Sequence, residues 1–375
     1  MIKQSDRLIS LDVFRGITIA GMILVNNPGN WSKVYKPLLH APWNGWTPTD
    51  FIFPFFLFIV GVAMSLSFNK RIDRGDTRSQ LFTKVVKRTL IIFAIGLFLA
   101  LVPFFNFKEV RIPGVLQRIA VCYFFAAVIM LSFNQKIQIG WTIFLLAIYW
   151  VLIKLVPVPG HGAGVLEPLG NLVWYLDSHL LAGHTWKFAP APGFDPEGIL
   201  STLPAIATVM FGIFTGDWIR SPREHYEKVA GLFVFGILGL VLGEILKGWL
   251  PINKNLWTST YSIFMAGMAL IFLAMCYWFI DIKGYKKWSK PFIIFGSNAI
   301  LVYGLSSLIA KLTVIINVMN VDGSKMLLKT YMFQNWFASW AGNNQFGSLL
   351  YPIAYLIIWL GLMYILYRKN IFIKI

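Results

Sequence analysis

The sequence predicts an all-α membrane protein, and three observations support that fold class. Of the 375 residues, 57% are hydrophobic and only 13% are charged, whereas about 25% of the residues in soluble globular proteins carry a charge. Several apolar runs approach the roughly 20 residues that a helix needs to cross a bilayer. Lysine and arginine gather in alternate connecting segments, which is typical of a polytopic membrane protein.

Ten apolar runs are expected to be transmembrane helices within a single domain over residues 1–375. They cover residues 11–27, 50–68, 85–103, 113–133, 138–156, 199–217, 228–246, 257–280, 291–311 and 349–367. The N-terminus leads directly into the first run without a small-residue cleavage site, so we expect no cleavable signal peptide. Cys122 and Cys276 lie inside apolar runs, which predicts buried thiols and no disulfide.

The charge distribution predicts that both termini are cytoplasmic. In that orientation the inside segments carry about twice as many Lys and Arg residues as the outside segments. The net charge of +17 therefore reflects membrane topology and does not indicate nucleic-acid binding. Two outside segments, 157–198 and 312–348, are long, and loops of such length are often functional.

The segment between the first two runs is the strongest candidate for a functional site. Its polar, proline-rich stretch carries His40, Asn44 and Asp50, and the predicted topology places it on the exterior side. Histidine titrates near neutral pH, so at a membrane surface it can exchange a proton with a soluble substrate. Asp50, ten residues later, could fix the tautomer of His40. The alternative is a histidine that only hydrogen-bonds within an aromatic loop.

Two arginines lie within apolar runs, where a charge costs a few kcal/mol unless it is paired or lines a wet cavity. Arg15 follows Asp12 by three residues, a spacing that predicts an ion pair on one helix face. For the role of Arg15, an arginine that snorkels and sets the depth of the helix is an equal alternative to one that binds a ligand. Arg118 lies about one turn inside the fourth run, beside Gln117, and Arg111 precedes that helix.

Other polar residues occur at separate exterior junctions, in the stretches D-P-E-G and I-N-K-N-L-W. Each alone is typical of a helix cap or a solvated loop. Together they predict the mouth of a pocket at one membrane face. We expect it to bind substrate through Asn44, Arg111, Gln117, Arg118, Asp195, Glu197, Asn253 and Asn255.

Familiar catalytic patterns are missing from the sequence. No paired His/Cys spacing typical of zinc occurs, so no metal is expected. No G-x-S-x-G, Walker or G-x-G-x-x-G pattern stands in a suitable context either. The chemistry must therefore be sought in the polar groups of the exterior junctions.

Seven motifs run in order from Ser10 to the C-terminus: S-L-D-V-F-R-G-I, V-N-N-P-G, H-A-P-W-N-G-W-T-P-T-D-F-I-F-P-F-F-L-F-I-V-G, R-I-P-G-V-L-Q-R, D-P-E-G-I-L, I-N-K-N-L-W and Y-R-K-N-I-F-I-K-I. Together they resemble the heparan-α-glucosaminide N-acetyltransferase family over nearly the whole chain. The chain looks like the bare transmembrane core of a bacterial member, without the family's lumenal domain and its extra leading span.

The resemblance implies transfer of acetyl from cytosolic acetyl-CoA to the amine of a terminal glucosamine across the membrane. The family's motif histidine falls on His40 and its motif asparagine on Asn26. The segment between them is a few residues longer here, so we expect the acceptor to differ more than the donor. The expected acceptor is a glucosamine-containing glycan on the periplasmic side of the bacterial inner membrane. The resemblance also implies a homodimer, although the many Trp and Phe residues equally suit lipid contact.

The roles in such a reaction follow from its chemistry. An amine attacks a thioester only when unprotonated, so His40 would accept its proton or carry the acetyl group as an acyl-imidazole. Asn26 would orient the imidazole or donate to the developing oxyanion.

Two other function classes stay open. A transporter or flippase of a lipid-linked glycan fits ten spans, but broken helices in symmetric halves would favour it and no such symmetry is visible. A structural membrane protein would use the polar motifs only as helix caps.

The phosphates of acetyl-CoA require cations, and the densest basic cluster lies between the second and third runs. We expect the nucleotide end to dock on the inner face against Arg15, Lys70, Arg71, Lys87 and Arg88. The thioester arm would run between spans one, two and four toward the histidine. The positive-inside signal accounts for part of the cluster equally well.

Overall fold

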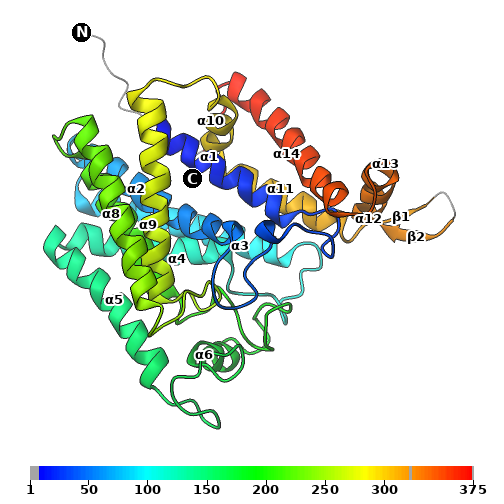
Figure 1. Cartoon of the computed structure of the whole chain (residues 1–375), viewed down its shortest axis with the longest axis horizontal. Coiled ribbons are helices and arrows are strands. Elements are labelled where there is room, and N and C mark those ends of the chain that lie inside the picture. Colours follow the sequence, from blue (N-terminus) through cyan, green and yellow to red (C-terminus); the bar gives the residue numbers. More distant parts are fainter. Residues whose placement is uncertain (1–7, 321–322, 374–375) are drawn as a thin grey trace. The chain divides into compact units, whose positions relative to one another are not determined.

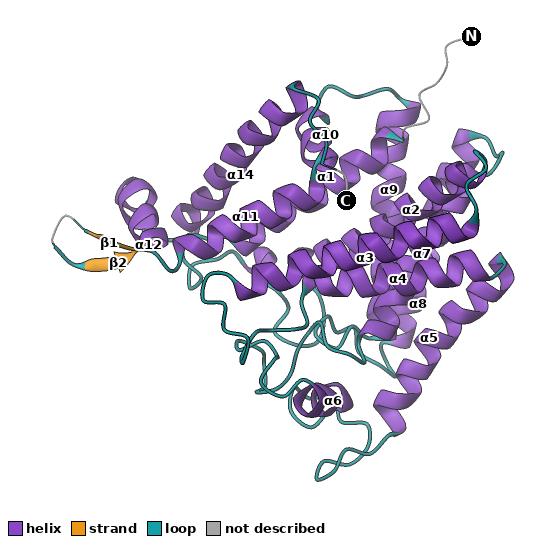
Figure 2. Cartoon of the chain, turned by 180° about the vertical axis from the view of Figure 1, so that it is seen from behind, coloured by secondary structure: helices purple, strands orange, loops and turns teal. Residues whose placement is uncertain are grey.

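The computed structural model describes residues 8–320 and 323–373, which fall into two compact units. The first unit takes its described residues from the ranges 1–40, 47–52 and 275–374. The second unit takes its described residues from the ranges 41–46 and 53–274. Helices dominate both units (Figures 1 and 2). This confirms the predicted all-α class.

The first unit joins the first helix of the chain to its C-terminal elements. Its helices are α1 (Ile9–Asn26), α10 (Lys290–Ser297), α11 (Ala299–Thr313), α12 (Leu328–Phe333), α13 (Ser339–Ala341) and α14 (Gln345–Arg368). Short 3-10 turns cover Lys36–Leu38 and Pro48–Phe51, and π-helical turns cover Tyr277–Ile282 and Gln334–Ala338. An antiparallel hairpin pairs β1 (Asn317–Met319) with β2 (Lys325–Leu327), with Val318 opposite Met326.

Helix α1 packs against α10 at very short range because glycine lies at the contact. A Cβ added at Gly16 would lie 1.8 Å from the carbonyl oxygen of Phe292. A Cβ added at Gly296 would lie 2.2 Å from the carbonyl oxygen of Asp12. Small residues let membrane helices approach this closely. The packing holds the N-terminal part of α1, where Arg15 lies.

The expected span over residues 291–311 is divided in the structure into α10 and α11, which meet at a bend of 83°. Asn298 at the break has a non-helical backbone, with φ −129° and ψ 42°. Its side chain instead binds the C-terminal segment, donating to the carbonyl of Ile371 at 3.0 Å and accepting from the amide of Ile373 at 2.8 Å. These bonds occupy the Asn298 amide, which makes no capping hydrogen bond to α11.

The second unit is a helical bundle with one long irregular segment. Its helices are α2 (Ile52–Ile72, whose first residue belongs to the first unit), α3 (Arg78–Leu101), α4 (Val115–Ser132), α5 (Gln135–Leu155), α6 (Leu172–Leu180), α7 (Thr202–Arg220), α8 (His225–Leu246) and α9 (Ser259–Cys276, whose last two residues belong to the first unit). Helix α3 lies beside α4, while α7 lies beside both α4 and α5 (Figure 2).

The number of helices that suit a membrane is close to the prediction. Among the described residues, eight helices are long and apolar enough to cross a bilayer, and the bent pair α10–α11 makes a ninth. Helix α3 covers most of the remaining expected span, residues 85–103. Its N-terminal half carries the charged residues Lys84, Lys87 and Arg88. The chain is therefore a polytopic helical membrane protein.

The segment 157–198, expected as a long loop, contributes to the core of the second unit. It contains α6 and a set of buried apolar side chains that includes Val158, Val173 and Phe194. These side chains pack with Tyr149 of α5 and with Leu256. The residues that follow, from Asp195 onward, are therefore supported by a packed layer.

Candidate functional site

The first unit holds His40 against Asp50 through a short, well-capped turn. Thr47 precedes the 3-10 turn Pro48–Phe51, and Pro48 suits its first position. Thr47 and Asp50 form a capping box, in which the amide of Thr47 donates to Oδ2 of Asp50 at 2.9 Å. The other carboxylate oxygen, Oδ1, lies 2.7 Å from Nδ1 of His40. The sequence therefore places Asp50 to bind one nitrogen of the imidazole.

Hydrogen bonds also fix the backbone that leads to His40. Thr47 Oγ1 donates to the carbonyl of Leu39, and Thr49 Oγ1 donates to the carbonyl of Pro37 at 3.1 Å. The side chain of Asp50 is 0% exposed, whereas that of His40 is 49% exposed. The carboxylate is thus buried behind an imidazole that remains accessible, as a base or nucleophile must be.

Asn26, the second expected catalytic residue, is the last residue of α1 and is exposed. Its neighbour Asn27 is buried and donates to the carbonyl of Ile23 at 2.8 Å, which closes the helix end. The loop that follows is tied to the start of α14, since the amide of Gly29 donates to the carbonyl of Ser348 at 3.0 Å. The sequence did not predict the contact with Ser348, because that residue lies far from Gly29 in the chain.

In the second unit, Arg111 joins the two acids of the D-P-E-G stretch. Its Nε and Nη2 atoms donate to the two carboxylate oxygens of Asp195 at 2.8 and 2.6 Å, and Nη2 also pairs with Glu197. Burial alone would lower the pKa of Arg111, but the two carboxylates outweigh it and raise that pKa. Burial likewise raises the pKa of Glu197, but Arg111 outweighs it and lowers that pKa. Arg111 and Glu197 therefore stay ionised within a compact group of three charged side chains.

Arg118 is buried, with 2% of its surface exposed. It contacts the end of the D-P-E-G stretch and the residues that follow. Its Nη2 donates to the carbonyl of Gly198 at 2.9 Å and to Ser201, and its guanidinium lies 5.3 Å from the ring of Trp257. Its Nε and Nη1 atoms make no hydrogen bond to the described residues. Gln117 is buried beside it. Arg118 thus positions the turn after Glu197.

Asp177 of α6 is a residue of this cluster that sequence reasoning missed. Its Oδ1 accepts from the amide of Ile199 at 2.9 Å, and its Oδ2 has no hydrogen-bond partner in the described chain. Burial raises the pKa of Asp177 to about 7. The available signal was an acid within the otherwise apolar stretch L-V-W-Y-L-D-S, but its partners 22 residues away could not be inferred.

A second polar contact joins Asn44 to Asn253. The Nδ2 atom of Asn253 donates to Oδ1 of Asn44 at 3.1 Å, and the amide of Gly45 donates to the carbonyl of Ile252 at 2.8 Å. Asn253 is fully buried, Asn44 is exposed, and Asn255 is half-buried in the same turn. Within the second unit, the structure therefore brings together several polar residues expected at separate junctions.

The expected donor-binding cations are partly paired with acids. Arg15 donates to Asp12 at 3.1 Å, which confirms the predicted ion pair, and it also reaches the carbonyl of Gly296 at 3.4 Å. Arg71 lies 3.6 Å from Asp76. The Arg88 guanidinium lies 5.0 Å from the ring of Tyr123, Lys87 is exposed and Lys70 is half-buried.

No group of three His, Cys, Asp or Glu side chains in the described parts of the chain is arranged to hold a metal ion. Cys122 and Cys276 are buried free thiols, as expected. Within the first unit, the chemistry on offer is that of His40 with its carboxylate.

Comparison with known proteins identifies the family. The family model described as "Heparan-alpha-glucosaminide N-acetyltransferase, catalytic" matches residues 7–243. Heparan-alpha-glucosaminide N-acetyltransferase of Mus musculus is 28% identical over 427 aligned positions, covering 100% of this chain and 61% of the mouse protein. The Homo sapiens protein of that name is 30% identical, covering 98% of this chain and 60% of its own length. This chain spans about three fifths of these relatives, and it belongs to the heparan-α-glucosaminide N-acetyltransferase family.

Proposed function

We propose that this protein is a transmembrane N-acetyltransferase that moves acetyl from acetyl-CoA to the amine of a glucosamine-type sugar. The observation that carries the proposal is the accessible imidazole of His40 bound to the buried carboxylate of Asp50 at 2.7 Å. Membership of the family supports the same reaction class. We place the protein in a bacterial inner membrane, with acetyl-CoA entering from the cytoplasm.

His40 supplies the base that amide formation needs. When Nδ1 carries the proton that is shared with Asp50, Nε2 of His40 is the basic nitrogen of the imidazole. Its lone pair can take a proton from the sugar ammonium, so that the amine can attack the thioester carbon. The acetyl–nitrogen bond forms as the carbon–sulfur bond breaks. Of the two protons that the ammonium nitrogen loses, one passes through His40 to the CoA thiolate and the other is released to solvent. The buried carboxylate stabilises the imidazolium in between.

The same geometry permits a two-step route. The Nε2 atom of His40 attacks the thioester, CoA leaves as its thiol, and the acyl-imidazole then delivers acetyl to the amine. Both routes pass through a tetrahedral oxyanion, which requires hydrogen-bond donors. Since Asp50 already orients the imidazole, we assign Asn26 to the oxyanion. Its exposed amide at the end of α1 is suited to donate to a ligand.

The acceptor-binding residues divide into two groups in our proposal. Arg111, Arg118, Asp195 and Glu197 bind one another or the backbone, together with the buried Gln117 and Asn253, so they shape the turns of the second unit. Asn44 and Asn255 retain exposed surface, so they are the side chains of this set that can reach hydroxyl groups of a sugar. We therefore assign sugar contacts to these two asparagines.

The donor phosphates are assigned to Arg15, Lys70, Arg71, Lys87 and Arg88, as the sequence predicted. Arg71 shares Asp76 with Lys84, so part of its charge is already balanced. Lys87 and Arg88 lie on α3 and have no ion pair with an acid in the described chain. A homodimer remains part of the proposal through the family alone.

The proposal is tested with purified protein, acetyl-CoA labelled in the acetyl group and glucosamine. We expect labelled N-acetylglucosamine, detected by chromatography and mass spectrometry. N-acetylglucosamine itself serves as the matched control acceptor, because it has the same ring but no free amine. Absence of labelled product from glucosamine and from glucosamine-containing glycans, above the level of this control, would contradict the proposed reaction.

A further inference from the structure

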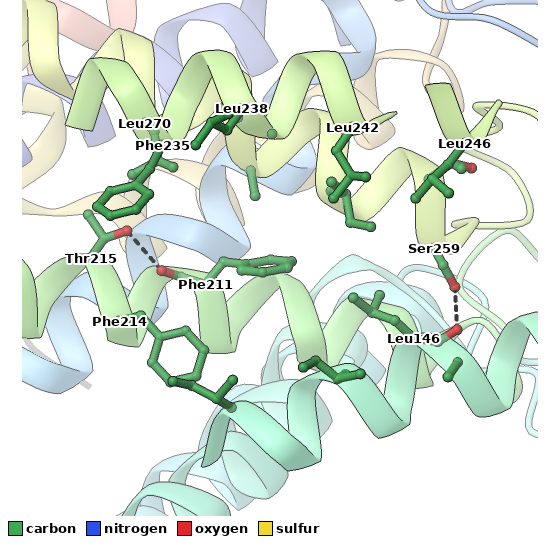
Figure 3. Close-up of a pocket in the computed structure, with 18 of the residues that line it drawn as sticks. Leu146, Phe211, Phe214, Thr215, Phe235, Leu238, Leu242, Leu246, Ser259 and Leu270 are labelled. Atoms are coloured by element: carbon green, nitrogen blue, oxygen red, sulfur yellow. Dashed lines mark hydrogen bonds between the residues drawn. The ribbon is translucent and has the colours of Figure 1, made fainter. Parts of the chain in front are cut away.

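The second unit contains a large apolar groove between α5, α7, α8 and α9. Its volume is about 920 Å³, which lies within the range of 300–1,000 Å³ typical of ligand pockets. Figure 3 shows Leu238, Leu242 and Leu246 of α8 on one side and Phe211 and Phe214 of α7 on the other. All four helices are long and apolar enough to cross a membrane, so the groove opens to the bilayer.

The walls of the groove are almost entirely apolar. The hydroxyl groups that line it already bond to backbone carbonyls: Thr215 to Phe211 at 2.8 Å and Ser259 to Leu146 at 2.7 Å (Figure 3). Thr260 similarly donates to the carbonyl of Leu250 at 2.8 Å. The walls therefore suit a hydrocarbon chain.

The length of the groove suits a flexible apolar chain. On α5 the lining residues extend from Gln135 to Trp150, a length of roughly 22 Å along the helix axis. A hydrocarbon chain that lies along these helices would contact apolar side chains over that whole length.

One end of the groove coincides with a proposed sugar-binding turn. Trp249, Leu250, Ser259 and Thr260 form that end, and they flank the turn that carries Asn253 and Asn255. Asn253 of this turn bonds to Asn44 at 3.1 Å. A molecule whose chain lies in the groove would thus present its polar head at the turn to which we assign sugar contacts.

We propose that the groove binds the hydrocarbon chain of a lipid-anchored acceptor, so that the amino sugar is delivered from the bilayer. This inference rests on the proposed acetyl transfer and adds the class of acceptor to it. The groove holds the chain along α5 and α8, whose most apolar stretches are only 33% and 22% buried within the protein. The anchor contributes binding energy remote from the reacting amine, which lowers the concentration of acceptor that the enzyme needs.

The test compares two acceptors, hexadecyl β-glucosaminide and free glucosamine, with the enzyme in lipid nanodiscs. Ile143→Trp on α5 and Leu242→Trp on α8 fill the groove from opposite walls, at side chains that are 61% and 46% exposed. Ile357→Trp on α14, where the side chain is 62% exposed and outside the groove, is the matched control. We expect each groove variant to lower kcat/KM for hexadecyl glucosaminide at least tenfold, with glucosamine within twofold of wild type.

Other outcomes separate this inference from the reaction itself. Unchanged kcat/KM for hexadecyl glucosaminide in both groove variants would overturn the groove assignment while leaving acetyl transfer intact. An equal loss with both acceptors would also overturn it, because the groove would then serve only the fold. Failure of the wild-type enzyme to acetylate either acceptor would instead contradict the proposed function on which the inference rests.

Discussion

The Nδ1 atom of His40 lies 2.7 Å from the Oδ1 atom of Asp50, and the carboxylate is fully buried while the imidazole is half-exposed. The other carboxylate oxygen is held by the amide of Thr47. This arrangement fixes which imidazole nitrogen faces the carboxylate and makes Nε2 the basic nitrogen. It is the feature from which the proposed acetyl transfer follows.

Replacing Asp50 by Asn should reduce kcat sharply. The asparagine amide can donate to Nδ1 and so favour the wrong tautomer of His40, a change that lowers kcat by about 10⁴ in serine proteases. We expect a loss of roughly 10²–10⁴ in kcat with little change in the KM for acetyl-CoA. Steady-state kinetics checks this, with Glu109→Gln, an exposed acid, as control. A kcat near that of wild type would remove Asp50 from the mechanism.

The donor site should respond to the loss of cations through KM. In the triple variant Arg15→Ala, Arg71→Ala, Arg88→Ala, we expect the KM for acetyl-CoA to rise at least tenfold and kcat to change little, because phosphate contacts lie far from the thioester. Binding should also weaken as salt is added. The matched control replaces Lys33, Lys36 and Lys325, which the sequence assigns to the exterior side. If CoA affinity is unchanged in the triple variant, the donor binds elsewhere.

The apolar pattern and short-range spacings predicted much of this structure. Run lengths located the helices, because a membrane helix is specified by its own composition. The contacts of Arg15 with Asp12 and of His40 with Asp50 also follow from nearby positions. In contrast, the break at Asn298 depends on a segment 73 residues away. Such a bond has no local signal, so the sequence did not predict the break.

The buried cluster around D-P-E-G shows the same limit. The acids and arginines were expected near a pocket mouth, and two of the arginines do meet the D-P-E-G segment. Their partners were not predicted, because those contacts depend on tertiary packing, as in the contact of Arg118 with the ring of Trp257. Asp177 was missed for this reason. Charge and spacing reveal that burying a charged group costs free energy, but only tertiary packing shows what that group binds.

Asp177 should make folding stability depend on pH. Its pKa is raised from 3.8 to about 7, so over that range the folded protein keeps a proton that the unfolded chain has lost. Stability from Asp177 is therefore complete below about pH 4 and is lost as the pH rises to about 7. This shift in the pKa of Asp177 corresponds to a change of at most roughly 4 kcal/mol in the free energy of unfolding.

The variant Asp177→Asn cannot ionise, so its stability relative to wild type should increase from pH 4 to pH 8. Thermal unfolding in detergent across this range measures the difference, with the exposed Asp73→Asn as control. If the stabilities of wild type and Asp177→Asn instead changed in parallel from pH 4 to pH 8, folding would not raise the pKa of Asp177.

Gly198 should tolerate no side chain. An added Cβ would lie 1.8 Å from Oδ2 of Asp177, and the carbonyl of Gly198 accepts from Arg118. We expect Gly198→Ala to lower the unfolding temperature by several degrees and to reduce acetyl transfer. Gly140 of α5 has open space around it, so Gly140→Ala should be neutral or slightly stabilising. Equal unfolding temperatures for the two variants would mean that the turn is free to move.

The measurement that tests the central claim most directly is the rate of acetyl transfer from acetyl-CoA to glucosamine by the His40→Ala variant. The imidazole is proposed to accept the amine proton or to carry the acetyl group, so its removal should lower kcat at least 100-fold. Folding is monitored by the unfolding temperature, and acetyl-CoA affinity should stay within about threefold of wild type. Transfer by folded His40→Ala at the wild-type rate would contradict the account, because no step assigned to His40 could then be required.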